Sequence, residues 1–256
     1  MSRSNPTETL QNPATKFVEW SGSEGKFKYY DKDKKENIFI ELPVKFIPLD
    51  VLSTVKGWND AEKKGYWSNE VRSTKTDTIT LRSKDGVEFV GTYEQVKEKY
   101  SSKGADYVQS VYAAMRDGKE LKIVNFQLKG SALGPFIEFC KGKKVTEIGV
   151  QIKEAKPMKK GATKYFEPVY EVMEVSEATN KIAIDLDVEL QTYLKAYLDK
   201  NKSSKEEVTV TDNQDNGLNQ VQSTKSSAQP VATKEDFKSK DAFVNSLSDE
   251  DDDLPF

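Results

Sequence analysis

Apolar and polar residues alternate along much of the chain, and this two-residue period predicts β-strands with one buried face. The stretches "KFVEW" and "KFKYY" predict a hairpin, because the glycine-bearing turn "SGSEG" lies between two alternating runs. The same pattern predicts further strands within residues 36–50, 65–74, 76–93 (two strands joined by the turn "SKDG"), 120–130 and 144–175 (one long hairpin).

Other segments have apolar residues at helical spacing. One of them begins with Thr92 and Gln95 at the spacing of a capping box, a typical helix start. The last of them is amphipathic, and we expect Asp187 to cap it. The predicted helices lie within residues 92–104, 105–118 (with Val108, Val111, Tyr112 and Met115 on one stripe), 131–142 and 187–202.

About eight strands with few helices predict a mainly β fold, a Greek-key or barrel-like core with helical insertions and a C-terminal helix. We assign this folded body to residues 15–200, after a polar, flexible arm at residues 1–14. Residues 201–248 are rich in Ser, Thr, Gln, Asn and Lys, so we expect a disordered linker. Residues 249–256, "DEDDDLPF", form a separate acidic tip.

The 256 residues include no histidine and a single cysteine, Cys140. This composition excludes catalytic triads with a histidine base and zinc sites built from His and Cys. One cysteine forms no internal disulfide and suits a reducing cytoplasm. No window resembles a membrane span or a signal peptide. Glycine-rich phosphate loops and complete calcium loops are also missing, so we expect no cofactor and no metal.

The net charge of −3 is distributed unevenly. Five of the 42 acidic residues lie in 249–256, which leaves 39 basic and 37 acidic residues, a net charge of +2, in the preceding 248. A mildly basic body with an acidic tip indicates nucleic acid as a partner, with the tail regulating access.

Lysines interleaved with aromatic residues supply what single-stranded nucleic acid requires: cations for the phosphates and flat rings on which unpaired bases stack. In "KFKYY", strand alternation places Lys26, Lys28 and Tyr30 on one face and Phe27 and Tyr29 on the other. The candidate DNA-binding residues are Trp20, Lys26, Lys28, Tyr30, Trp58, Tyr66, Trp67, Arg72, Lys75, Lys156, Lys159, Lys160, Lys164 and Tyr165.

A structural role competes with this interpretation at each position. Aromatic residues at alternate strand positions more often belong to a core, and lysines on edge strands often only prevent aggregation. We expect Trp67 and Tyr30 to be the exposed exceptions, because each has polar neighbours on its own strand face. The lysines of residues 156–164 fit a solvated loop and a DNA-contacting loop equally well. The side chains expected in the core are Phe136, Phe139 and Cys140, the last as a thiol without a chemical role.

The acidic tip, the polar linker and the basic–aromatic strands together resemble the replicative single-stranded DNA-binding proteins of bacteria and phages. The resemblance rests on "DDDLPF" at residues 251–256 and on the overall layout. It implies an OB-fold body that protects single-stranded DNA during replication, recombination and repair. It also implies that the final Phe enters an apolar pocket on a polymerase, helicase, primase or nuclease, whose basic rim meets the aspartates. The partner-binding residues so implied are Asp249, Glu250, Asp251, Asp252, Asp253, Leu254, Pro255 and Phe256.

The folded body is much longer than a minimal OB domain, which favours a phage-encoded member that acts in the host cytoplasm. The structural zinc of some phage relatives has no ligands here. We therefore predict a non-enzymatic protein, and a homo-oligomer is compatible with the sequence. Two other functions also fit: a protein–protein adaptor of the replication machinery, which would ignore poly-dT, and a histidine-free nuclease or annealing enzyme, which would consume labelled DNA only with magnesium.

Overall fold

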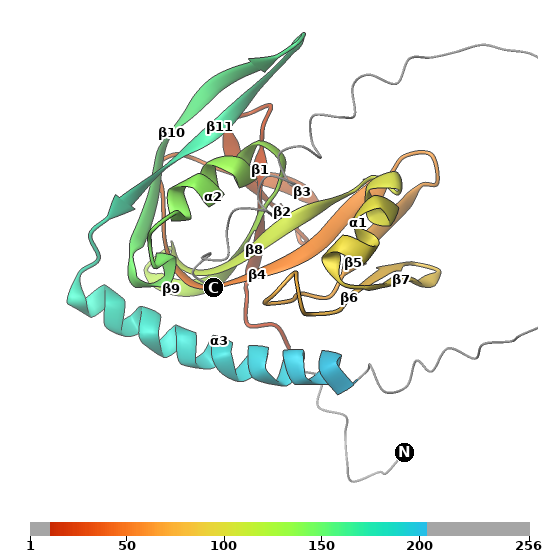
Figure 1. The fold of residues 1–256 in the computed structure, drawn as a ribbon. Coiled ribbons are helices and arrows are strands. Elements are labelled where there is room, and N and C mark those ends of the chain that lie inside the picture. Colours follow the sequence, from red (N-terminus) through yellow and green to blue (C-terminus); the bar gives the residue numbers. More distant parts are fainter. Residues whose placement is uncertain (1–10, 204–256) are drawn as a thin grey trace, which may run out of the picture. The chain divides into compact units, whose positions relative to one another are not determined.

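The computed structural model describes residues 11–203 (Figure 1). This part of the chain is mainly β, with eleven strands in one sheet and three α-helices. The strands are β1 (Lys16–Ser21), β2 (Lys26–Asp31), β3 (Glu36–Ile40), β4 (Val44–Asn59), β5 (Lys64–Ser68), β6 (Ile79–Ser83), β7 (Gly86–Gly91), β8 (Ala105–Asp117), β9 (Glu120–Leu128), β10 (Gly149–Lys160) and β11 (Thr163–Met173). The helices are α1 (Tyr93–Ser102), α2 (Leu133–Cys140) and α3 (Glu177–Ser203), with short 3-10 turns η1 (Gly130–Ala132) and η2 (Val145–Glu147).

Nine strands follow one another across the sheet in the order β3-β2-β1-β9-β8-β4-β5-β6-β7. Neighbouring strands are antiparallel except β1 and β9, which are parallel. After α2 the chain returns as β10 to pair with β4. The spatial order β10-β4-β8-β9 is therefore that of a Greek key, with β1 as a fifth strand beside β9.

The β10–β11 hairpin reaches back to the first strand and curls the sheet. The backbone N–H of Phe166 donates to the carbonyl of Gly22 at 2.8 Å, and the indole N–H of Trp20 donates to the carbonyl of Phe166 at 3.0 Å. The sheet therefore encloses one of its faces, which we call the inner face. The opposite side is called the outer face.

The inner face holds the larger core. Phe126 contacts Phe27 and Phe46 there, with ring centroids 5.3 and 4.4 Å apart. α2 covers one end of this core with the three side chains predicted to belong to it: Phe136, Phe139 and Cys140. Burial raises the pKa of the Cys140 thiol to about 12, so the thiol stays protonated and unreactive at neutral pH.

α3 packs on the outer face of β4, β8 and β9 and forms a second core there (Figure 1). Its contributions are Ala183, Leu190 and Leu194, and they contact a patch of the sheet that includes Leu52 and Tyr112. The segment before β1 lies on the same patch. The amide of Asn12 donates to the hydroxyl of Tyr112 at 2.9 Å, and the backbone N–H of Thr15 donates to the carbonyl of Ile123 at 2.8 Å. Residues 12–14, assigned to a flexible arm from the sequence, therefore have defined contacts.

Several predicted elements are confirmed. They include the hairpin β1–β2, the turn "SKDG" between β6 and β7, the hairpin β10–β11 and the start of α1. The backbone N–H of Thr92 donates to Oε1 of Gln95 at 2.8 Å, which is one of the two hydrogen bonds of the predicted capping box.

The helix predicted at residues 105–118 is wrong, because this segment is strand β8. β8 pairs with β4 along one edge and with β9 along the other, and both of its faces are buried. Burial on both faces removes the polar alternation of a strand, and the remaining apolar run resembles a helical stripe. The predicted cap of the last helix is wrong too. α3 begins at Glu177, so Asp187 lies in its interior, and the hydroxyl of Ser176 instead accepts from the N–H of Thr179.

A buried carboxylate, paired with a half-exposed arginine, fastens α3 to the sheet. Both oxygens of the buried Asp50 carboxylate accept from the guanidinium of Arg72, at 2.9 and 2.7 Å, and the amide of Gln191 on α3 donates to the same carboxylate at 2.9 Å. Replacing Asp50 by Ala removes the acceptor of these three hydrogen bonds, while Arg72 keeps Oε1 of Gln191 and the amide of Gln191 keeps Asp187. We expect Asp50→Ala to lower the free energy of unfolding by about 2 kcal/mol, measured by urea denaturation, because hydrogen bonds to a charged group are lost and no buried charge is left unpaired.

The matched control is Lys26→Ala, which breaks the exposed pair between Lys26 and Glu41 (2.7 Å). An exposed pair contributes about 1 kcal/mol or less. Equal losses in the two variants would contradict the role given to Asp50.

Candidate nucleic-acid interface

The outer face can be followed across the sheet through directly paired residues. Phe39 of β3 lies opposite Lys28 of β2, and Lys28 lies opposite Glu19 of β1. Glu19 in turn faces Gln127 of β9, which faces Ser110 of β8. Because residues that pair directly across neighbouring strands have their side chains on the same face of a sheet, these five residues share the outer face.

The same face continues onto β4 and β5. Asp106, four residues before Ser110 on β8, lies opposite Lys56, and Lys56 lies opposite Trp67 of β5. Residues two positions along a strand share a face. This places three more aromatic side chains on the outer face, namely Phe17, Tyr30 and Trp58.

Every aromatic side chain that is more than 36% exposed within residues 11–203 lies on this one face. They are Tyr30 (58%), Trp58 (56%), Phe17 (44%), Trp67 (43%) and Phe39 (42%). Scattered exposed apolar residues are normal, whereas a group on one face marks an interaction surface. We call this group, with the lysines among it, the outer aromatic surface: Phe17, Lys28, Tyr30, Phe39, Lys56, Trp58 and Trp67.

Lys56 links the two halves of the outer aromatic surface. Its ammonium lies 5.7 Å from the centroid of the Phe17 ring, although β8 and β9 separate their strands. Within residues 11–203 no carboxylate forms an ion pair with it. Burial lowers the pKa of Lys56, and the charges of Glu70 and Glu19 partly offset this effect. Lys56 is thus a partly desolvated cation with no direct anionic partner among the described residues, which suits it to a phosphate.

Beside this surface, on the same face of the sheet, a buried hydrogen-bond network fixes the central strands. The hydroxyls of Ser110 and Tyr112 both donate to the carboxylate of Glu70, the latter at 2.8 Å. The amide of Asn125 donates to Ser110 at 2.6 Å, and the N–H of Glu70 donates to the hydroxyl of Tyr197 on α3 at 2.9 Å. The network holds Glu70 rigidly and keeps a negative charge near Lys56.

Two of the predicted stacking residues belong to the core instead. Trp20 is 8% exposed and its indole is hydrogen-bonded to Phe166, while Tyr66 is 2% exposed and its hydroxyl donates to Glu62. Both point away from the outer face because the neighbouring residues on their strands occupy it. A buried ring cannot stack on a base, so neither residue belongs to the outer aromatic surface.

The other predicted residues on the front half of the chain divide into two groups. Lys28, Tyr30, Trp58 and Trp67 lie on the outer face, and the expected exposure of Tyr30 and Trp67 is confirmed. The remaining three lie elsewhere or have partners of their own: Arg72 pairs with Asp50, Lys26 pairs with Glu41, and Lys75 is exposed in the connection between β5 and β6.

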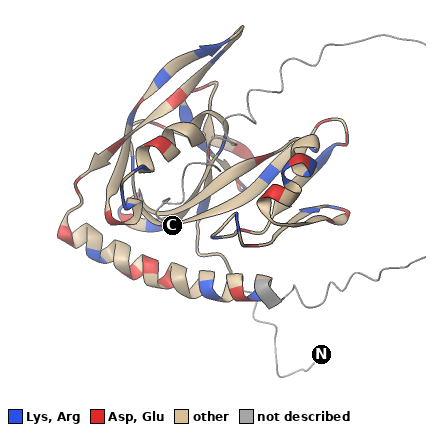
Figure 2. Cartoon of the chain, in the orientation of Figure 1, with Lys and Arg blue, Asp and Glu red and all other residues tan. Residues whose placement is uncertain are grey.

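The predicted DNA-binding residues of the long hairpin, four lysines and a tyrosine, lie together near its tip, where Figure 2 shows blue Lys and Arg positions on β10 and β11. The lysines are exposed and Tyr165 is half-buried. The residues are Lys156, Lys159, Lys160, Lys164 and Tyr165.

Sequence reasoning missed Phe17 and Phe39 and did not select Lys56 or Arg82, which lies opposite Trp67 on β6. The signal for Phe17 was present. In "KFVEW" the core side chains Val18 and Trp20 alternate, so Phe17 shares its face with Glu19 and lies outside the core. An aromatic residue on the polar face of a strand is the pattern that identifies such positions.

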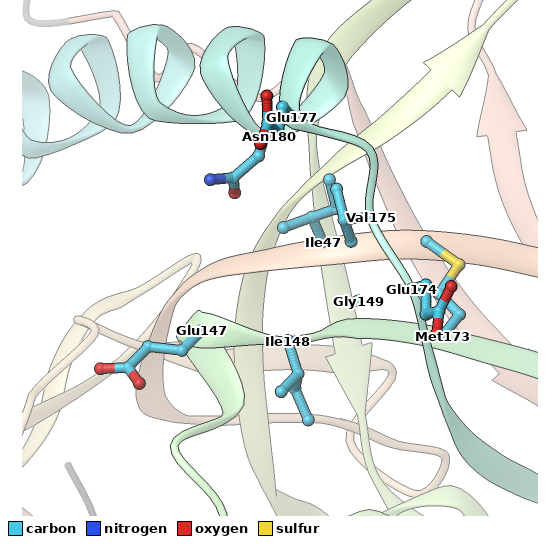
Figure 3. A pocket seen from close by; sticks show the side chains of 9 residues that line it. All are labelled: Ile47, Glu147, Ile148, Gly149, Met173, Glu174, Val175, Glu177 and Asn180. Carbon is cyan, nitrogen blue, oxygen red and sulfur yellow. The ribbon is translucent and has the colours of Figure 1, made fainter.

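A pocket at the start of α3 has the wrong charge for nucleic acid. Figure 3 shows Glu147 and Glu174 in its wall, with Glu177 and Asn180 on α3. No basic residue lines it, so it would repel a phosphate.

The predicted acidic tip, and the predicted linker beyond residue 203, lie outside the described residues. In the part of the chain that the structure covers, no helix is both long and apolar enough to cross a membrane. The chain was compared with models of known protein families, with curated proteins and with solved structures, and no match was found in any of the three.

Proposed function

We propose that this chain is a non-enzymatic protein that binds single-stranded DNA on the outer aromatic surface and recruits other proteins through residues 249–256. The observation that carries the proposal is the gathering of all strongly exposed aromatic side chains, among residues 11–203, on one face of one sheet with Lys28 and Lys56 between them. Such a face offers stacking platforms and cations together, which unpaired nucleotides require and a duplex, whose bases are already stacked, does not.

The strand arrangement supports an OB-fold assignment for the body. Four strands in Greek-key order, with β1 as the fifth, fit the five-stranded, partly open barrel of that fold. OB-folds bind oligonucleotides on the face of their second and third strands and on the loops beside it. Counted along the Greek key from β4, those strands are β8 and β9, which lie between the two halves of the outer aromatic surface.

The acidic tip carries the second part of the proposed function, the recruitment of other proteins. Five carboxylates followed by Leu254, Pro255 and Phe256 suit a partner with an apolar pocket and a basic rim. If residues 204–248 form the disordered linker expected from their composition, a flexible coil of that length has a root-mean-square span of about 40 Å. The tip can therefore reach bound enzymes of replication or repair, and also the lysines of its own body.

Binding of a labelled dT oligomer, followed by fluorescence anisotropy at several salt concentrations, tests the proposal against the adaptor alternative. We expect binding that weakens as the salt concentration rises, because each phosphate contact releases a counterion. A plot of the logarithm of the association constant against the logarithm of the salt concentration should have a slope, called the salt slope below, of about −0.7 per contact. An adaptor without DNA binding would leave the anisotropy unchanged. Loss of the label only in the presence of magnesium would instead indicate a nuclease.

Deleting residues 249–256 is expected to tighten dT binding. The deletion removes five negative charges that compete with phosphates for the same lysines. The gain should be severalfold at low salt and should vanish as salt screens the tip. Replacing all five acidic residues of 249–253 by their amides should reproduce it, since the charge and not the length of the tail is responsible. Identical affinities for the full and shortened chains across the salt series would contradict this competition.

A further inference from the structure

The distal part of the β10–β11 hairpin differs chemically from the outer aromatic surface. Residues 155–166 contain four lysines and no acidic residue. Lys159 and Lys164 lie directly opposite each other, and neither they nor Lys156 forms an ion pair with any residue of 11–203. Like charges placed opposite each other destabilise a strand pair. An anionic ligand would remove this repulsion.

This segment projects as a two-stranded ribbon. β10 pairs with β4 only through Val150, Gln151 and Ile152, and further out it pairs with β11 alone. Ala155 and Phe166 still lie against Gly25 at the β1–β2 turn. The outer end of β10 and β11 extends away from the body (Figure 1). Beyond Ala155 five residues of β10 (156–160) extend outward, and beyond Phe166 three residues of β11 (163–165) do so. At about 3.4 Å per residue the free part of the ribbon is roughly 10–17 Å long.

The ribbon has charge without stacking platforms. Within residues 156–165 the one aromatic side chain is Tyr165, which is half-buried, whereas all five strongly exposed rings lie on the outer face of the sheet. Alternation puts Lys159 and Lys164 on one side of the ribbon and Lys156 on the other. Cations on both sides and no exposed ring suit a ligand whose phosphates are accessible and whose bases are already stacked.

We propose that the distal β10–β11 hairpin binds duplex DNA by entering its major groove. The major groove of B-form DNA is about 12 Å wide and admits a two-stranded β-ribbon, so lysines on both sides of the ribbon meet the phosphates of both strands. The A-form groove of duplex RNA is too narrow and deep to admit it. This inference rests on the proposed function. If both hold, the chain binds a junction between single-stranded and duplex DNA, with the single strand on the outer aromatic surface and the adjoining duplex on the hairpin.

The test compares four ligands: a dT oligomer, the same dT as an overhang on a DNA duplex, the blunt DNA duplex, and an RNA duplex with the dT overhang. The full chain is expected to bind the DNA junction about tenfold more tightly than dT alone, and the RNA junction no better than dT. The double variant Lys159→Ala/Lys164→Ala should bind the DNA junction only as well as dT, with a salt slope smaller by about 1.8. Its affinity for dT itself should stay unchanged.

The control is Lys141→Ala/Lys144→Ala, which removes two exposed lysines of the loop after α2, each paired with a nearby glutamate. It should behave as the unaltered chain. Equal losses for dT and junction in the hairpin variant would overturn the inference, because the hairpin would then belong to the single-strand path. So would equal affinity of the unaltered chain for dT and the DNA junction. A chain that ignores dT but binds the blunt duplex through these two lysines would contradict the proposed function and support the hairpin as a duplex site.

Discussion

Replacing Trp58 and Trp67 by alanine together is expected to weaken dT binding about 100-fold. The two indoles lie on the outer face of neighbouring strands β4 and β5, where both are largely open to solvent. Stacking of a base on an aromatic side chain contributes about 1–3 kcal/mol, so each ring that stacks a base separately accounts for roughly a tenfold change. Because neither ring is in the core, the variant should unfold at nearly the same urea concentration as the unaltered chain.

The control for this variant is Ile184→Ala/Val188→Ala. These two side chains are as exposed as the tryptophans, at 55% and 64%, but lie on α3. Their removal should leave dT affinity within twofold. Unchanged affinity in the tryptophan variant, or an equal loss in the α3 variant, would remove the outer aromatic surface as the binding site.

Replacing Lys56 by methionine is expected to weaken dT binding and to stabilise the fold at the same time. Burial lowers the pKa of Lys56, which means that the folded chain disfavours the charged ammonium. Methionine keeps most of the volume without the charge, so the free energy of unfolding at pH 7 should rise by about 0.5–2 kcal/mol. The loss of one phosphate contact should weaken dT binding about tenfold and reduce the salt slope by about 0.7.

The pH dependence of stability follows from the same shift. Because the pKa of Lys56 is lower in the folded chain than its ordinary value of 10.5, the unfolded chain binds more protons in the interval between the two values. Stability therefore rises with pH across that interval and the destabilisation is fully present below it. The difference in the free energy of unfolding between Lys56→Met and the unaltered chain should therefore shrink as pH increases toward 10.5.

Lys119→Met, at the exposed turn after β8, is the control and should change neither the free energy of unfolding nor the affinity for dT. A Lys56→Met chain that is less stable than the unaltered one would contradict this account of Lys56.

The strands that could be predicted from the sequence are those with one buried face. In β2 the alternation of Phe27 with Lys26 and Lys28 correctly predicts which side chains face inward and which face outward. β8 could not be predicted, because Val111 faces the inner core and Tyr112 faces α3, and a strand buried on both faces shows no two-residue period. The start of α3 was missed because Asp187 has the side chain of a typical cap, although it lies ten residues inside the helix.

The candidate site was predictable only in part, for a reason of geometry. The alternation within one strand assigned Tyr30 to an exposed face, since its immediate neighbours decide that question. The position of Tyr66 depends instead on the packing of the β5–β7 region, and the closeness of Lys56 to Phe17 depends on how the sheet curls between β1 and β4. Local sequence patterns carry no information about contacts between strands so far apart in the chain.

The central claim is that unpaired bases stack on the outer aromatic surface, and the intrinsic fluorescence of the three tryptophans tests it most directly. The full chain would be titrated with a dT oligomer at several salt concentrations, in parallel with Trp67→Phe and Trp58→Phe. The account predicts strong quenching, because Trp58 and Trp67 are exposed while the buried Trp20 provides an unquenched remainder. Each single variant should lose its own share of the quenching. A salt-dependent affinity without any quenching would show that DNA binds elsewhere, and would contradict the account.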